Sequence, residues 1–242
     1  MIDDLQLLRT GDIEVLGRIV EASNATLLCV ITAGERTAHC VYKPVAGERP
    51  LWDFPDGTLA EREVASYAVS EATGWGIVPP TVLREGPAGT GMVQLWIDGD
   101  EDVDLVELIN SRPPALRRMA VLDAVINNSD RKGGHLIPGA APKGTALADR
   151  HVWGVDHGVT FSVDDKLRTL LWQWAGEPLT GEALDVLARL REQLDGALGE
   201  RLQELLTVAE VRRTAERIEE LLRRRRHPMP SEGWPSVPYP PF

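Results

Sequence analysis

The chain has 242 residues and a formal net charge of −11, with 43% hydrophobic and 26% charged residues. This length allows one large or two small domains with a sizeable core, and the composition is that of an ordinary globular protein. The acidic balance argues against broad nucleic-acid binding, which needs a basic surface that displaces counterions from phosphates. No secretory leader opens the sequence and no apolar run reaches the length of a membrane span, so we expect a cytoplasmic protein.

Strand patterns dominate the first part of the chain. Residues 1–16 could form a short helix or a first strand. An antiparallel meander is predicted from three further strands at 18–21, 26–32 and 37–43. Cys29 and Cys40 would face each other across the last hairpin, and in a cytoplasmic protein we expect two buried thiols.

Lys43 closes the third predicted strand, where alternation places it on the same face as Val41. A lysine that projects from a strand beneath a strand-turn-strand flap is what a nucleotide phosphate site requires. Ser23 and Asn24 would form the tip of this flap and contact phosphates through backbone amides. The flap lacks a glycine-rich pattern, and a solvated lysine at a strand end is the alternative interpretation.

A helix is predicted from Leu59 to Thr73, with Gly74 as its stop. The loop before it, 46–58, is rich in proline, glycine and aspartate, and we expect its aromatic side chains to pin it to the body of the protein. Glu63 lies one helical position from the apolar face. It could reach back to Lys43 and hold that lysine forward, or it could be one of several surface charges.

The chain changes character after Ile97. Strands are predicted at 81–83 and 92–97 around a glycine-rich hairpin, and the acidic run 98–102 then breaks the pattern. Because strand character precedes this run and helix character follows it, we place a domain boundary there. The predicted parts are an N-lobe at 1–97, a C-lobe at 98–226 and a proline-rich tail at 227–242.

Helices are predicted in the second part at 103–110, 114–127, 164–174, 180–194 and 198–225, the last with a break near Thr207. Residues 138–150 read as a loop or loose hairpin. The last helix ends in Arg223, Arg224, Arg225 and Arg226, whose charges offset the helix dipole or serve peripheral membrane contact. The tail is too rich in proline for regular structure, and it could be mobile, docked on the chain itself or bound by a protein partner.

Two carboxylates follow predicted elements in the C-lobe. Asp130 comes after the helix 114–127, and Asp156 comes after a short β-branched run. In kinase-type phosphoryl transfer one aspartate orients the acceptor hydroxyl, a side chain five positions later holds a metal, and a second aspartate after a strand holds metal again. His135 is five positions after Asp130. The pattern predicts a metal-nucleotide site, although both segments also have the composition of simple turns.

Six segments of the sequence resemble the phosphatidylinositol 3- and 4-kinase-related superfamily: Val-Tyr-Lys-Pro, Glu-Arg-Glu-Val-Ala-Ser-Tyr, Val-Pro-Pro-Thr-Val, Met-Val-Gln-Leu-Trp-Ile, Asn-Ser-Asp-Arg-Lys-Gly-Gly-His-Leu and Val-Asp-His-Gly-Val-Thr-Phe. The resemblance covers about residues 15–175 and is strongest to a small bacterial branch, with toxin kinases of the HipA type as more distant relatives. It implies an α+β, two-lobed protein-kinase-like fold with a β-rich N-lobe and a mostly helical C-lobe. The implied function is ATP- and metal-dependent phosphotransfer to a lipid, protein or small-molecule acceptor, with Mg²⁺ or Mn²⁺ as the metal.

The resemblance also implies a role for each site residue. Lys43 would contact the ATP phosphates and pair with Glu63. Asp130 would orient or deprotonate the acceptor hydroxyl, and Asp156 would hold magnesium. The hinge that offers backbone groups to adenine would consist of Gln94, Leu95, Trp96 and Ile97.

The sequence departs from the related lipid kinases at two positions of the motif Asp-Arg-His-x-x-Asn. Lys132 stands in place of the histidine, and His135 stands in place of the metal-binding asparagine. Magnesium prefers oxygen ligands, so His135 suggests a weakened metal site, tolerance for manganese, or nucleotide binding without fast turnover. The alternative function is therefore a pseudokinase or nucleotide-binding regulatory protein. A third possibility is a scaffold in which Asp130 and Asp156 do not approach each other.

Overall fold

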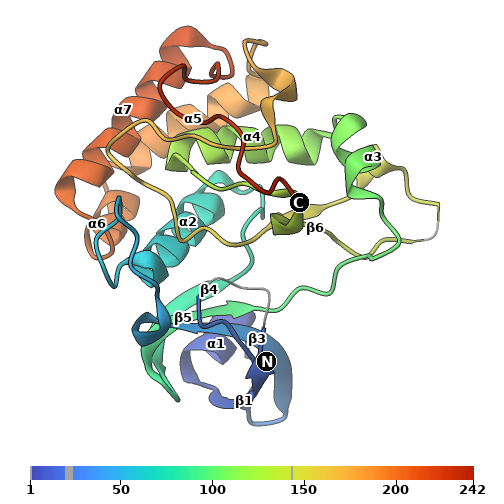
Figure 1. Ribbon diagram of the computed structural model, residues 1–242, viewed down its shortest axis with the longest axis vertical. Coiled ribbons are helices and arrows are strands. Elements are labelled where there is room, and N and C mark those ends of the chain that lie inside the picture. The colour runs from blue at the N-terminus through green and yellow to red at the C-terminus, as the bar shows by residue number, and fades with distance from the viewer. Residues whose placement is uncertain (1, 20–23, 143) are drawn as a thin grey trace.

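A β-rich lobe and a helical lobe make up the computed structural model, which describes residues 2–19, 24–142 and 144–242 (Figure 1). The polypeptide crosses between them along 96–104, after the last strand of the sheet and before the helices of the second lobe. This two-lobed α+β arrangement confirms the fold class expected from the sequence. Within the described residues, no helix combines the length and the hydropathy needed to cross a membrane.

The N-lobe is built on one antiparallel sheet of five strands in the order β1-β2-β3-β5-β4. Its elements are α1 (Asp4–Thr10), β1 (Asp12–Arg18), β2 (Leu27–Ala33), β3 (Arg36–Pro44), the 3-10 turn η1 (Val45–Gly47), α2 (Leu59–Thr73), β4 (Thr81–Gly86) and β5 (Gly89–Leu95). The first 16 residues thus hold both a helix and a strand. The strand predicted at 18–21 ends at Arg18 instead, and residues 20–23 lie outside the described part.

The hairpin of β2 and β3 is confirmed in detail. Cys29 and Cys40 are directly opposite in the register, and both are buried free thiols. Burial raises the pKa of the Cys40 thiol to about 12, with a further contribution from Cys29. Protonated, buried thiols of this kind behave as small apolar side chains, as the sequence predicted.

Helices dominate the C-lobe, which also carries one short hairpin. The elements are α3 (Leu105–Asn110), α4 (Pro114–Ile126), η2 (Gly133–His135), β6 (Leu136–Pro138), η3 (Leu147–Asp149), β7 (Val152–Gly154), η4 (Trp172–Trp174), α5 (Gly181–Gln193), α6 (Ala197–Gln203) and α7 (Val208–Arg224). The break near Thr207 is confirmed, because Thr207 caps α7 in a capping box with Glu210.

The helix predicted at 164–174 is wrong. Only the 3-10 turn η4 is helical there, because the backbone of this segment pairs with the loop that follows α4. The Arg131 N–H donates to the Arg168 carbonyl at 3.0 Å, and the Leu170 N–H donates to the Arg131 carbonyl at 3.1 Å. Hydrogen bonds between these distant segments replace the local ones that a helix would make.

Most of the arginines at the end of α7 make contacts that are ordinary for the C-terminal end of a helix. Arg223 and Arg224 pair with Glu220, and Arg225 is the left-handed C-cap residue. His227 differs from them, since burial, followed by the neighbouring Arg117, lowers the pKa of its imidazole to about 4. It is therefore a neutral packing residue, while contact of the arginines with an anionic surface stays a prediction.

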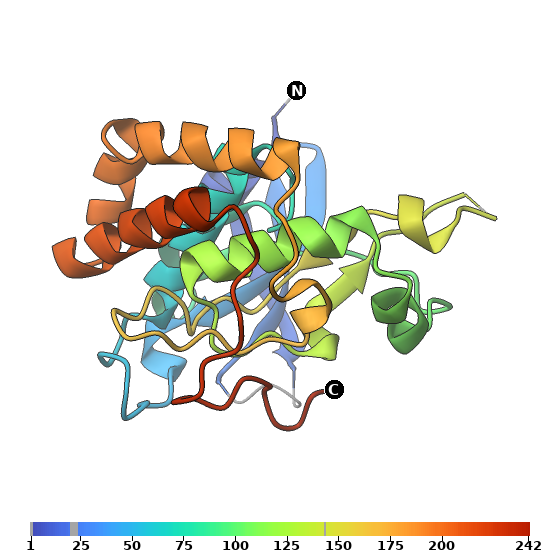
Figure 2. The same cartoon turned by 90° about the horizontal axis from the view of Figure 1, so that it is seen from above.

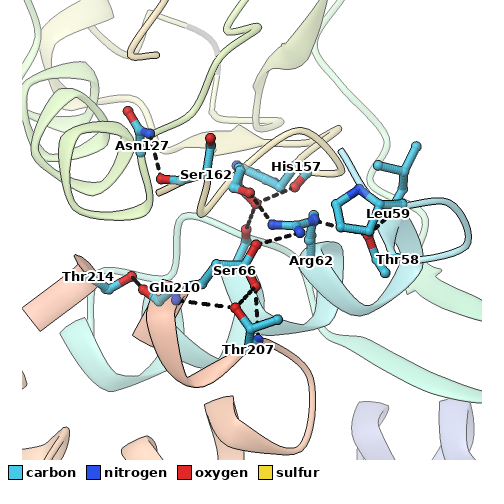
Figure 3. Close-up of polar contacts among 12 residues, drawn as sticks. Thr58, Leu59, Arg62, Ser66, Asn127, His157, Ser162, Thr207, Glu210 and Thr214 are labelled. Carbon is cyan, nitrogen blue, oxygen red and sulfur yellow. Dashed lines mark hydrogen bonds and ion pairs between the residues drawn. The ribbon is translucent and has the colours of Figure 1, made fainter. Parts of the chain in front are cut away.

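Helix α2 joins the two lobes. Its residues Ala60 and Val64 pack on Met92 of β5, while Ala65 and Val69 belong to the core of the C-lobe helices. The buried Arg62 donates from Nη2 to Glu210 of α7 at 2.6 Å (Figure 3). An ion pair at the junction thus fixes the position of the helix that carries Glu63.

Replacing Glu210 with glutamine should lower the free energy of unfolding by about 3–5 kcal/mol, because it leaves the buried Arg62 guanidinium without its counter-charge. The Thr207 N–H and Arg62 outweigh burial and lower the pKa of Glu210 from its usual 4.5. The contribution is therefore complete above pH 4.5 and fades as the pH falls through the lower folded value. Urea unfolding at pH 7 and at pH 3.5 measures both effects.

Glu216→Gln on the same helix is the matched control. The Glu216 side chain is 48% exposed and pairs with Arg212 and Arg213 of the same helix, so its loss should cost less than about 1 kcal/mol. Equal destabilisation by the two variants would contradict the role assigned to the Arg62–Glu210 pair.

Candidate active site

A cleft of about 270 Å³ opens between the sheet of the N-lobe and the β6–β7 hairpin of the C-lobe. The side chains that line it come from the flap strands, β3, β5, the residues after β5, and the two ends of the hairpin. They are Ile19, Asn24, Thr26, Val41, Lys43, Gln94, Leu95, Trp96, Ile97, Gly134, His135, Ile137, Val155 and Asp156. An apolar interior with a few convergent charged groups is typical of a small-molecule site.

Lys43 stands at the centre of the polar end of this cleft. Its ammonium lies 2.6 Å from Glu63 Oε1 and 2.9 Å from Asp156 Oδ1. Glu63 is 1% exposed, and its other oxygen accepts from the His157 N–H at 2.8 Å. The predicted pairing of Lys43 with Glu63 is therefore observed, and Glu63 is not a surface charge.

The charges of these groups reinforce one another. Burial alone lowers the pKa of the Lys43 ammonium, but Asp156 and then Glu63 outweigh it, so the net pKa lies above its ordinary value. Lys43 is in turn the main reason that the pKa of Asp156 falls well below its usual range. Both groups are fully charged at neutral pH, with a single lysine facing two carboxylates.

Asp156 reaches the cleft through an unusual backbone conformation. Its φ is +60°, in the left-handed region that a non-glycine residue rarely adopts. The β6–β7 ladder continues past the strand ends, where the Val155 N–H donates to the His135 carbonyl at 3.0 Å. This pairing brings His135, which precedes β6, beside Asp156, which follows β7. The side chain of Asp156 is 52% exposed and faces the open cleft.

His135 and Asp156 are the pair that could hold a cation. His135 Nε2 lies 3.3 Å from Asp156 Oδ2, and burial lowers the pKa of the imidazole, with Asp156 opposing that shift. A neutral imidazole beside a carboxylate fits a divalent metal whose other ligands are nucleotide oxygens. Among the described residues, no group of three or more His, Cys, Asp or Glu is arranged to hold a metal by itself.

Asp130 lies beside the cleft, in the loop that follows α4. Its carboxylate is flanked by Lys132 Nζ at 3.0 Å and Arg168 Nη2 at 3.2 Å, and its side chain is 21% exposed. The Asn128 side chain holds the loop, since Asn128 Oδ1 accepts from the Asp130 N–H at 3.0 Å. Asp130 is thus a partly accessible carboxylate with two cationic neighbours.

A buried ion pair supports both halves of this site. Arg131 Nε and Nη2 donate to the two carboxylate oxygens of Asp123, at 3.0 and 2.8 Å, and both side chains are 0% exposed. Arg131 also donates to the Val155 carbonyl at 3.0 Å and contacts His157 Nε2 at 2.6 Å. Burial, followed by Arg131, keeps the pKa of His157 well below its ordinary value. Arg131, in the loop that carries Asp130, therefore contacts both neighbours of Asp156, namely Val155 and His157.

The predicted hinge residues line the cleft, and the described part of the predicted flap lies on the Lys43 side of it. Ser23 is outside the described residues, whereas Asn24 lines the cleft and accepts from the Arg49 N–H at 2.9 Å. The N–H groups of Leu95 and Trp96 already donate to the carbonyls of Pro80 and His39. Gln94 uses its buried side-chain amide on Thr81, at 2.8 Å. A ligand at the hinge would therefore meet backbone groups around Ile97.

The proline-rich tail, residues 227–242, is docked on the chain itself. From α7 it passes to the loop that carries Asp130, near β6 (Figures 1 and 2). The Ser236 carbonyl accepts from the Thr169 N–H at 3.0 Å, and the Pro241 carbonyl accepts from the Gly133 N–H at 2.8 Å. The Phe242 ring packs so closely on Gly133 that a Cβ there would lie 2.1 Å from it.

Nearer the start of the tail, Trp234 belongs to an aromatic cluster around Lys166. The Lys166 ammonium lies 5.1 Å from the centre of the Trp52 ring and 5.2 Å from that of Trp234, and it pairs with Asp53 at 2.9 Å. Trp52 and Asp53 belong to the loop before α2. Phe54 of this loop is 7% exposed and lies against Arg62 and Lys166, so it pins the loop as the sequence predicted, whereas Trp52 is 86% exposed.

Sequence reasoning missed several residues that shape the site. One signal was available, because Asp123 interrupts an apolar helix, and a lone buried carboxylate needs a partner. No comparable signal marks Arg168, Lys166 or the end of the tail, whose roles depend on segments that meet only in the folded protein.

The chain is similar to one curated protein along nearly its whole length and to solved kinase structures at low sequence identity. No protein-family model matches the sequence. Protein Rv2133c of Mycobacterium tuberculosis is 43% identical over 275 residues, which cover 99% of this chain and 96% of the relative. The structure of the proinflammatory kinase CtkA of Helicobacter pylori matches with a TM-score of 0.51 at 11% identity, over 88% of this chain and 92% of that one.

A second solved structure is the Rio2 kinase–ADP/Mg²⁺–phosphoaspartate complex from Chaetomium thermophilum. It matches with a TM-score of 0.38 at 11% identity, over 86% of this chain and 66% of that one. The similarity to CtkA shows that the two lobes form a protein-kinase-like fold. The identity to the mycobacterial protein extends over nearly the whole of both chains. The chain therefore belongs to the family of protein Rv2133c.

Proposed function

We propose that the protein is an ATP- and metal-dependent phosphotransferase. The observation that carries this proposal is the arrangement around Lys43, which is held by the buried Glu63 and lies against Asp156 at the polar end of an apolar cleft. In kinases, a strand lysine paired with a helix glutamate contacts the nucleotide phosphates, and an aspartate after a strand holds the metal. Three residues, from β3, from α2 and from the turn after β7, meet here in that relationship.

The apolar part of the cleft suits the adenine of ATP, and its charged end suits the phosphates. The adenine would lie between apolar residues of the two lobes, such as Val41 and Ile137, with its edge toward the backbone at Ile97. The phosphates would lie toward Lys43, whose ammonium would exchange one carboxylate partner for phosphate oxygens. Mg²⁺ or Mn²⁺ would be held by Asp156 and His135 and would neutralise the developing charge during transfer.

Asp130 is the group we assign to the acceptor. Its position beside the cleft suits a carboxylate that accepts the proton of, or orients, an acceptor hydroxyl. Lys132 and Arg168 on either side would attract the anionic group being transferred. Within kinase-like folds, the motifs around Asp130 and Asp156 favour the phosphatidylinositol 3- and 4-kinase-related group, with the acceptor a lipid, a protein or a small molecule.

A second candidate is a pseudokinase or nucleotide-binding regulatory protein. Two observations favour it. Asp130 already has two cationic partners, and the tail packs on Gly133, three residues further along the same loop. His135 in place of an oxygen ligand adds a metal site that magnesium would fill less readily.

ATP with Mg²⁺ or Mn²⁺ should raise the unfolding midpoint of the protein. A ligand at a hundred times its dissociation constant stabilises by about 2.7 kcal/mol, or roughly 5–10 °C for a chain of this size. Asp156→Ala should abolish the metal-dependent part of the shift, whereas Asp185→Ala, at an exposed position of α5, should leave it unchanged. No shift with any combination of nucleotide and metal would refute a nucleotide site.

Asp130→Asn should lower the rate of phosphate release or transfer from ATP by about 10²–10⁴-fold, because the amide cannot accept the acceptor proton. Nucleotide binding should persist, since Asp130 is not among the residues that line the described cleft. Asp102→Asn, in the exposed connector, is the matched control. Unaltered turnover in Asp130→Asn would overturn its assigned role, and a wild type that binds ATP without turnover would establish the regulatory alternative.

His135→Asn should shift metal preference from Mn²⁺ toward Mg²⁺, because it replaces an imidazole nitrogen with an amide oxygen. The ratio of the ATP-dependent thermal shifts with the two metals reports this preference without requiring turnover. A ratio equal to that of the wild type would show that His135 is not a metal ligand.

A further inference from the structure

A second cavity, of about 370 Å³, lies between α4, α7 and the beginning of the tail. It shares no lining residue with the nucleotide cleft. Its wall also includes the segment from Asp165 to Trp172, so it lies behind the part of the chain that pairs with the Asp130 loop. The volume is sufficient for a small organic ligand.

Arg217 of α7 enters this cavity with unused hydrogen-bonding capacity. Its side chain is 7% exposed, and one nitrogen, Nη2, donates to the Ser162 carbonyl. Nε and Nη1 are buried and have no hydrogen-bond partner in the described part of the protein. The nearest carboxylate, Asp165, is 3.9 Å from Nε, which is beyond hydrogen-bond distance. Buried donors left unpaired are rare and costly, so this guanidinium lacks a partner that a ligand could supply.

Three arginines line the cavity, and its two carboxylates, Asp165 and Glu220, are shared with other arginines. Asp165 is paired with Arg213 at 2.8 Å, and Glu220 is paired with Arg224 at 2.6 Å. Burial, followed by repulsion from Arg213, lowers the pKa of Arg217 to about 10, which still leaves it charged at neutral pH. The cavity therefore holds an excess positive charge.

The remaining wall is largely apolar. Leu167, Trp172, Leu221 and Met229 line it. The Trp172 indole N–H is already used on the Ser236 carbonyl at 2.7 Å. The Asn127 amide is used as well, on the carbonyls of Ser162 and Asp164. Apart from the charged residues, a ligand would thus meet mostly hydrocarbon and the Trp172 indole.

We propose that this cavity binds an organic anion, with a carboxylate or phosphate head on Arg217 and an apolar body against Trp172, Leu221 and Met229. The head would pair with the Arg217 guanidinium, and a shift of this side chain toward the cavity would bring the unpaired Nε and Nη1 donors to it in the forked geometry that guanidinium offers to planar or tetrahedral anions. The apolar body would replace solvent along the hydrocarbon wall. The site is separate from nucleotide binding and does not depend on phosphotransfer.

Isothermal titration calorimetry on the full chain tests this site with four probes: octanoate, octyl phosphate, 1-octanol and inorganic phosphate, all below the concentration at which micelles form. At least one of the two amphiphilic anions, octanoate or octyl phosphate, should bind saturably with one site per chain. Octanol and inorganic phosphate should bind at least about tenfold more weakly, since each lacks one half of the ligand. Comparing octanoate with octyl phosphate distinguishes the two head groups.

Two variants and a control locate the site. Arg217→Met should weaken binding of the preferred anion at least about tenfold, because it removes the charge and keeps the apolar stem. Arg226→Gln, on the rim, should weaken it severalfold without altering Arg217. Arg223→Gln is the matched control, because Arg223 is 71% exposed on the same helix and does not line the cavity.

Three outcomes would overturn the proposal. They are the absence of saturable binding of both anions, octanol binding as tightly as the anions, and equal anion affinity in wild type and in folded Arg217→Met. If Arg217→Met does not fold, the comparison of octanol with the anions and the Arg226→Gln result decide the question. Inorganic phosphate binding as tightly as octyl phosphate would also contradict the proposal, because the apolar wall would then contribute nothing.

Discussion

The buried ion pair of Asp123 and Arg131 is the constraint on which the site depends. A charge taken out of water must find a partner, and removing one member of such a pair costs about 3–5 kcal/mol. Arg131 uses its remaining donor to hold the Val155 carbonyl and contacts His157 as well. The loop that presents Asp130 and the turn that presents Asp156 are therefore fixed relative to each other by one guanidinium inside the C-lobe.

Helix α2 connects the N-lobe to the turn that carries Asp156. Glu63 on this helix holds Lys43 and accepts the His157 N–H, so one carboxylate links the strand lysine to the turn that carries Asp156. One residue earlier in the chain, Arg62 ties the helix to Glu210 and to the Thr160 carbonyl. Because the two contacts come from adjacent residues, a shift of α2 would disturb the lysine pair and the lobe junction together.

The tail packs on the loop that carries Asp130. It is held by the aromatic cluster around Lys166, by two bonds to the Ser236 carbonyl, and by Phe242 against Gly133. Gly133 follows Asp130 by three positions, so the end of the tail contacts the same loop as Asp130. The segment that contacts the tail through Thr169 and Trp172 also lines the Arg217 cavity, through Asp165, Leu167 and Trp172.

The sequence alone determined the elements whose causes are local. Strand alternation put Lys43 on the cleft face, helix periodicity set Glu63 one position from the core, and the cap at Thr207 divided the last helices. The resemblance to kinases supplied the order in which such elements form two lobes. Tertiary structure decided the rest. Residues 164–171 are not helical because their backbone pairs with the Asp130 loop, and the tail packs on the chain itself. Those outcomes depend on hydrogen bonds and buried charges between segments far apart in the chain, which no local pattern encodes.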